Sequence, residues 1–202
     1  MMPKISIRHN KFLDPIFVGW IKAQPQWKDW KRPSDELIKS QISMYNEEWD
    51  KYGERILRGI CEATGLNFKR NQIDVYVVSG SLRPFSRPIV IKSGYEPDYF
   101  VNVLTHELIH CLYSDNDEEV NKPLHYPHEN HTVSVHVYLN AILKYIYIDV
   151  LGEPERYELD KKMVADSKLG YNIAWDIVDK IGHLKLIEDF KEKMHEQKKT
   201  SR

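Results

Sequence analysis

Residues 101–112 read Val-Asn-Val-Leu-Thr-His-Glu-Leu-Ile-His-Cys-Leu, and this stretch places two histidines, His106 and His110, one helical turn apart. Four residues advance an α-helix by about 400°, so the two imidazoles lie roughly 40° apart on one face. Their nitrogens can then reach one ion at the distance of about 2.0–2.1 Å that zinc requires. Glu107 is rotated by about 100° from His106, so it flanks the ion without binding it and can take a proton from water.

The residues on both sides of this pair are uncharged, which favours a buried helix over a solvated one. Leu104 and Thr105 precede the motif, and Cys111 and Leu112 follow it. Together with Val101 and Leu108, several of them form an apolar stripe at helical spacing. The pattern therefore predicts a metal-binding helix that packs on a core.

The elements expected around this helix predict an α+β fold in which helices dominate. Apolar spacing and helix caps predict a helix from 34 to about 65, and apolar runs predict strands at 73–78 and 88–92. Pro84 and Pro88 favour an edge position for the second strand, just before the motif helix at 97–113. The second half is read as a histidine-rich loop at 114–130 and helices at 130–150, 154–167 and 170–195. We expect a single domain over 1–202, with an N-terminal wrap at 1–33, a core at 34–150 and a C-terminal helical part at 151–202.

Residues 103–112, with the sequence VLTHELIHCL, resemble the extended signature of the zincin superfamily of zinc metallopeptidases. The order of helix, strand, edge strand, motif helix and second helix is also similar to the upper subdomain of these enzymes, over about residues 34–150. The resemblance implies zinc ligands at His106 and His110 and a general base at Glu107. It also implies that an extended substrate peptide pairs with the strand at 88–92.

A catalytic zinc site has a third protein ligand and one open position, and three residues compete for that third place. His136 lies about two turns into the helix at 130–150, with Asn140 one turn further on the same face, and a gluzincin-like or minigluzincin-like enzyme donates its ligand from such a depth. Glu129 follows His110 by 19 residues, a separation close to that of gluzincins. His125 follows it by 15 residues, which is similar to SprT-like proteases. We rank His136 first, Glu129 second and His125 third.

Composition gives no sign of a nucleic-acid or membrane partner. The chain has 29 Lys and Arg against 30 Asp and Glu, a formal charge of −1, and no apolar run approaches the 18 residues of a membrane span. The cysteines, Cys61 and Cys111, are 50 residues apart and have no CxxC spacing, so we expect a reducing, cytoplasmic location.

We therefore expect a zinc-dependent metallopeptidase-like hydrolase that binds one Zn²⁺ and acts on a peptide or protein substrate. A donor to the developing oxyanion would help such a reaction, and Tyr157, Tyr171 and His183 are candidates. The alternative is a zinc-containing module on the same scaffold that binds peptide or protein without catalysis.

Overall fold

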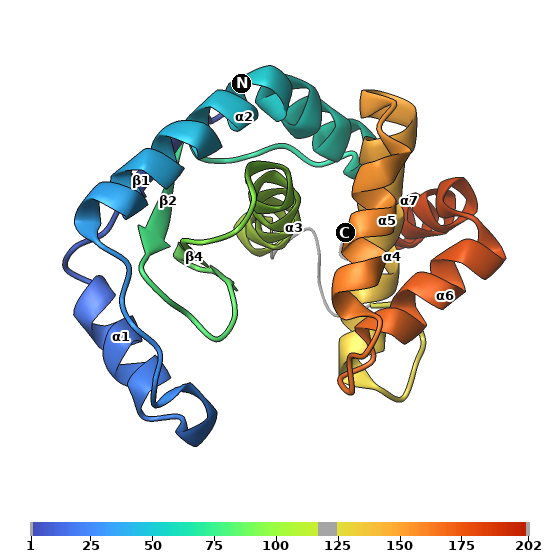
Figure 1. The fold of residues 1–202 in the computed structure, drawn as a ribbon. Coiled ribbons are helices and arrows are strands. Elements are labelled where there is room, and N and C mark those ends of the chain that lie inside the picture. Colours follow the sequence, from blue (N-terminus) through green and yellow to red (C-terminus); the bar gives the residue numbers. More distant parts are fainter. Residues whose placement is uncertain (1, 117–124, 201–202) are drawn as a thin grey trace. The chain divides into compact units, whose positions relative to one another are not determined.

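The computed structural model of the chain describes residues 2–116 and 125–200, and in these ranges the fold is α+β with helices dominant. Its elements are β1 (Lys4–His9), α1 (Asp14–Lys22), the 3-10 turn η1 (Pro25–Trp27), α2 (Asp35–Thr64), β2 (Gln72–Val78), β3 (Phe85–Ser86), β4 (Ile89–Lys92), α3 (Pro97–Asp115), α4 (His131–Tyr145), the π-helix η3 (Ile146–Leu151), α5 (Pro154–Val164), α6 (Tyr171–Ile181) and α7 (His183–Thr200). Figure 1 shows these elements in chain order by colour.

The chain divides into two compact units. The first comprises residues 1–53 and 70–111, and the second comprises residues 54–69 and 112–202. The division falls inside α2, after Gly53, and inside α3, after Cys111. The motif helix therefore belongs to the first unit up to one residue past His110.

A small mixed sheet lies in the first unit, with the strand order β1-β2-β4-β3. β1 and β4 both run parallel to β2, whereas β3 is antiparallel to β4. Buried branched side chains of β2 and β4, which include Val75, Val77 and Ile91, make up its middle, as expected for central strands of a sheet covered on its faces. The first part of α2 runs along this sheet (Figure 1).

Helices α2 and α3 pack together within the first unit through aromatic side chains. The ring of Tyr45 stacks on that of Phe100, with centroids 3.8 Å apart and planes 4° from parallel. The Tyr45 hydroxyl also donates a 2.9 Å hydrogen bond to the carbonyl oxygen of Tyr95, just before α3 begins. These contacts fix the start of the motif helix against α2.

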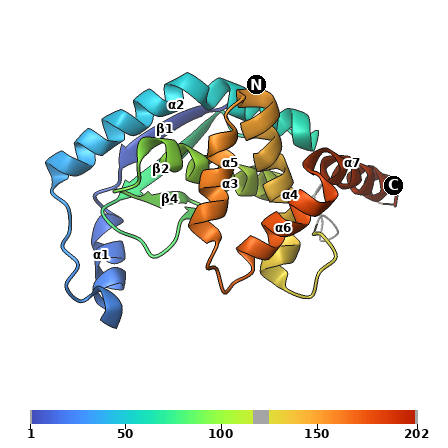
Figure 2. The same ribbon diagram turned by 45° about the vertical axis from the view of Figure 1, so that its right-hand side comes forward.

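In the second unit, α4 packs against α6 and α7, and the ribbon in Figure 2 shows this group of helices from a second angle. Side chains from the middle of α4, such as Leu139 and Ile142, are fully buried. Tyr138 of α4 contacts the ring of Phe190 in α7, with centroids 5.6 Å apart. α4 is thus the buried helix of this unit.

Most of the elements expected from the sequence are confirmed, with differences at their ends. The helix expected at 34–65 is α2, the motif helix extends two residues further than expected, and the helix expected over 170–195 is divided at Gly182 into α6 and α7. Gly182 has φ of +95°, a conformation that an L side chain rarely adopts and that ends α6. The loop expected at 114–130 lies partly outside the described residues, at 117–124.

One expectation about the sheet was wrong, and one strand was not predicted. β4 was expected at its edge, but β3 pairs with it through Phe85–Val90 and Ser86–Ile89, so β3 is the outer strand. No strand was predicted within the N-terminal wrap at 1–33, and there Lys4–His9 form β1, in register with β2 from Gln72 to Val77. No helix within the described ranges combines the length and the apolar character needed to cross a membrane.

Candidate metal centre

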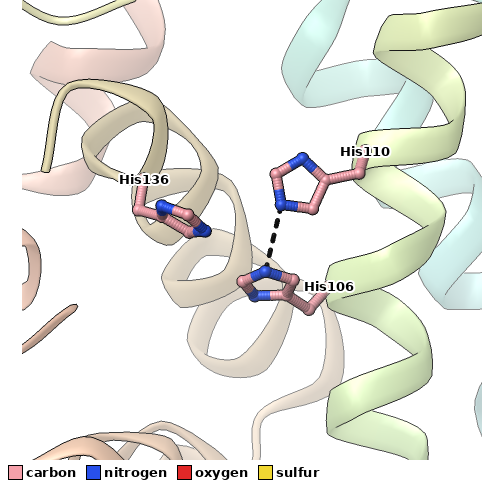
Figure 3. Close-up of side chains that lie close together, drawn as sticks. All are labelled: His106, His110 and His136. Atoms are coloured by element: carbon pink, nitrogen blue, oxygen red, sulfur yellow. Dashed lines mark hydrogen bonds between the residues drawn. The ribbon is translucent and has the colours of Figure 1, made fainter. Parts of the chain in front are cut away.

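The two histidines of the motif lie on one face of α3 and aim at each other, as their spacing predicts. Their Nε2 atoms are 3.1 Å apart, and their ring centroids are 4.9 Å apart (Figure 3). Two nitrogens bound tetrahedrally at about 2.0–2.1 Å from one zinc ion would be about 3.3 Å apart. The pair is therefore already spaced for a shared ion.

The rest of this helical turn holds the pair in place, because its other side chains are in the core. Leu108, Ile109 and Leu112 are fully buried, whereas His106 and His110 are half-buried. One turn earlier, the Thr105 hydroxyl donates a 2.7 Å hydrogen bond to the carbonyl oxygen of Val101. The apolar stripe expected from the sequence is therefore confirmed.

His136 lies on α4, whose start is capped by Asn130. The Asn130 side chain accepts hydrogen bonds from the backbone amides of Thr132 and Val133, and this is a common way to begin a helix. His136 is buried, and its Nδ1 lies 2.7 Å from the carbonyl oxygen of Thr132. A carbonyl oxygen only accepts, so Nδ1 carries the proton, and Nε2 keeps the lone pair that a metal needs.

Burial lowers the pKa of His136, and the nearby His131 lowers it further, although the hydrogen bond to Thr132 acts in the opposite direction. A lowered pKa keeps the imidazole neutral, the state that binds a metal ion. The ring of Tyr171 packs edge-on against His136, with centroids 4.6 Å apart. The lowered pKa and the contact with Tyr171 therefore favour a neutral imidazole held in one orientation, as a metal ligand requires.

His106, His110 and His136 together form a group that could hold a metal ion. Each offers one ring nitrogen, and these three atoms all lie within 4.8 Å of one another. Figure 3 labels the three side chains, His106 and His110 on one helix and His136 on another. Three imidazoles suit zinc, and they also bind copper, iron or nickel, so the donor set does not by itself identify the metal.

Glu107 lies in the first unit beside this pair and is 4 % exposed. The Ser86 hydroxyl of β3 donates a 2.7 Å hydrogen bond to its Oε2 atom. Burial raises the pKa of Glu107, and the Ser86 hydrogen bond and the charge of Arg83 lower it. Burial has the larger effect, so the resulting pKa is about 7. A carboxyl group with a pKa near neutrality is suited to receive and give back a proton.

The other two residues considered as a third ligand lie in the loop before α4, and both are exposed. The ring of His125 faces that of His131, with centroids 5.5 Å apart. Neither His125 nor Glu129 is in the group that the structure gathers around His106 and His110. Asn140, expected on the same face as His136, is buried, and no described residue accepts a hydrogen bond from its Nδ2 atom.

Of the three possible oxyanion donors, Tyr171 is the one that contacts a member of the histidine group. The Tyr157 hydroxyl donates to Asp179, 2.6 Å from Oδ2, and Lys144 and Lys161 bind the same carboxylate. His183 Nε2 lies 2.7 Å from a carboxylate oxygen of Asp149. Tyr157 and His183 therefore belong to polar contacts elsewhere in the second unit.

Ser86 was not found from the sequence. It sits in a strand of two residues and meets Glu107 across a separation of 21 positions, and neither a periodicity nor a motif marks such a contact.

Comparison of the chain with models of protein families, with curated proteins and with solved structures found no match.

Proposed function

We propose that the protein is a zinc-dependent metallopeptidase-like hydrolase with a zincin-like fold, in which His106, His110 and His136 bind one Zn²⁺. The observation that carries this proposal is the convergence of three imidazole nitrogens within 4.8 Å, next in sequence to a buried carboxyl group. Three neutral histidines leave the fourth position of a tetrahedral zinc open, which is the arrangement of catalytic sites.

Bound zinc would polarise a peptide carbonyl and lower the pKa of water. Glu107 then acts as general base: it accepts the proton of the attacking water and passes it to the leaving amine. Its pKa of about 7 supports both steps, because the same group must gain and lose a proton near neutral pH. Tyr171, beside His136, is our candidate donor to the developing oxyanion.

A zincin-like arrangement is supported by the order of elements before the motif, in which β4 ends at Lys92 and α3 begins at Pro97. We place an extended peptide or protein substrate at the edge of the sheet formed by β3 and β4. β3 already covers Ile89 and Val90 there, so the substrate would pair with the free side of β3 or with the end of β4.

One observation favours the alternative, a non-catalytic module that binds zinc and a peptide. Glu107 is 4 % exposed and is already hydrogen-bonded to Ser86, as a carboxyl group with only a structural role would be. Under that alternative, the histidines still bind zinc, but no bond is broken.

The substitution Glu107→Gln separates the two functions. It removes the base but keeps the shape and an oxygen that can accept from Ser86. For the hydrolase, zinc stays near one per chain by elemental analysis, while cleavage of a fluorescence-quenched peptide mixture falls by about 10²–10⁴-fold. Glu96→Gln, an exposed carboxylate just before α3, is the matched control and keeps full activity.

If the unmodified protein binds zinc but cleaves none of the peptides, the binding module is the correct function. If the purified protein binds no zinc at all, both functions are wrong.

A further inference from the structure

β3 is a strand of only two residues whose side chains have different partners. Neighbouring side chains of a strand point to opposite faces. The ring of Phe85 contacts aromatic rings of α1, and the hydroxyl of Ser86 meets Glu107. β3 pairs with β4 in a defined register, Phe85 with Val90 and Ser86 with Ile89, and this pairing sets the position of Ser86 along β4.

Phe85 ties β3 to α1 within the first unit. Its ring centroid lies 5.7 Å from that of Phe17 and 6.0 Å from that of Trp20, in edge-on and tilted arrangements that aromatic pairs prefer. The guanidinium of Arg83 lies over the same ring, 5.2 Å from its centroid. The residue next to Ser86 in β3 is thus anchored through its ring to α1 and to Arg83.

The Ser86 hydroxyl engages Oε2 of Glu107 at 2.7 Å, within a part of the structure where the carboxyl group is buried. A carboxylate has two oxygens. The hydrogen bond from Ser86 to Oε2 restricts the rotation of the carboxyl group, and so it also restricts the direction in which the other oxygen, Oε1, can accept a proton. A glutamate side chain without such a contact has three rotatable bonds and reorients easily.

We propose that Ser86 is a positioning residue for Glu107: by holding Oε2, it aims Oε1 at the place where the reacting water is deprotonated. This inference rests on the proposed function, because it assigns Ser86 a part in proton transfer. Ser86 itself exchanges no proton with the substrate; it acts through the geometry of Glu107, where a displacement of about 1 Å can cost about 10²-fold in rate.

The test uses substitutions at position 86 in the full chain. Ser86→Ala and Ser86→Val remove the hydroxyl. Ser86→Thr keeps the hydroxyl on a side chain that has the same branched shape as valine. We expect kcat to fall by about 10–100-fold in the Ala and Val variants, with KM and the zinc content unchanged, and to return in the Thr variant. Because Thr and Val are alike in shape, this pair separates the hydroxyl from packing even if Ser86→Ala does not fold.

Ser81→Ala is the control in the same loop, because the Ser81 hydroxyl donates to the carbonyl oxygen of Arg83 and not to Glu107. It should leave kcat unchanged. A loss of kcat equal to that of Ser86→Ala would overturn the inference, since the order of the whole loop would then be responsible. Loss of zinc from the Ser86 variants would also overturn it.

A second measurement does not depend on activity. Crystal structures of the zinc-loaded protein should show Glu107 in one orientation in the unmodified chain and in several orientations in Ser86→Val. If the carboxyl group disperses but the unmodified protein cleaves no peptide, the proposed function is wrong and the hold of Ser86 on Glu107 stands. If cleavage is found and Glu107 keeps its orientation in Ser86→Val, the positioning role is wrong and the hydrolase stands.

Discussion

The third ligand is a choice between single residues, and zinc affinity can decide it. His136 is buried with its Nδ1 bonded to a carbonyl oxygen, whereas Glu129 and His125 are exposed. We expect His136→Ala to weaken zinc binding by more than the 10–100-fold that is typical for loss of an outer-shell partner. Competition with a chromogenic chelator measures this, and Glu129→Ala and His125→Ala are matched controls that should bind as the unmodified chain does. Tight binding in His136→Ala, with weak binding in either control, would move the third ligand to the loop.

For single residues, the sequence predicts those relations that the geometry of one helix determines. The relation of His106 to His110 follows from a spacing of four residues, and the structure has the two Nε2 atoms 3.1 Å apart. The contact of Ser86 with Glu107 joins two elements, β3 and α3, across 21 positions of the sequence. No local rule contains that information.

At the scale of elements, α1 is joined to the end of β2 through one buried carboxylate. Asp14, 2 % exposed at the start of α1, accepts hydrogen bonds from the amide and hydroxyl of Ser79. It also accepts two from the guanidinium of Arg32, at 2.9 and 2.8 Å. Since α1 in turn contacts Phe85, this carboxylate supports the strand that carries Ser86.

We expect Asp14→Asn to destabilise the fold by about 1–3 kcal/mol, because it removes the charge that these donors share. Burial raises the pKa of Asp14, but the hydrogen bonds from Ser79 and Arg32 outweigh it, so the pKa lies below its ordinary value. A carboxyl group with a lowered folded-state pKa contributes stability above its unfolded pKa of about 3.9, and the contribution is lost as the pH falls through the folded-state value. The difference in melting temperature between Asp14→Asn and the unmodified chain should thus be full above about pH 5 and shrink below about pH 4. Asp29→Asn, at an exposed position, is the control, and a difference that does not change with pH would contradict this account.

The errors in predicting elements have physical causes. Residues 4–9, Lys-Ile-Ser-Ile-Arg-His, alternate polar and apolar side chains, which is a strand signal, but no strand was predicted there because prolines interrupt the rest of the N-terminal stretch. β4 was expected at the edge because of Pro84 and Pro88, and these prolines instead flank β3, which is too short for its two residues to show any period. The long helices were predicted well because each repeats its apolar pattern over several turns.

For the whole molecule, the order of the expected elements predicted an α+β chain with helices dominant, which is confirmed, but neither this order nor the balanced charge specifies a function. The proposed function depends on three imidazoles that come from α3 and α4, and His136 follows His110 by 26 positions. A metal that binds only the folded chain stabilises it by mass action, so metal removal reports on the entire fold.

With free zinc at about 1,000 times its dissociation constant, binding stabilises the fold by about 4 kcal/mol. At this chain length, a chelator should then lower the melting temperature by about 8–16 °C. Added zinc should restore it, whereas magnesium should not, because Mg²⁺ prefers oxygen ligands to imidazole. The double substitution His106→Ala and His110→Ala is the control, since without the pair the chelator has no bound ion to remove and the melting temperature should not respond. Differential scanning fluorimetry checks each of these outcomes, and an equal response in the double variant would place the stabilising metal at other residues.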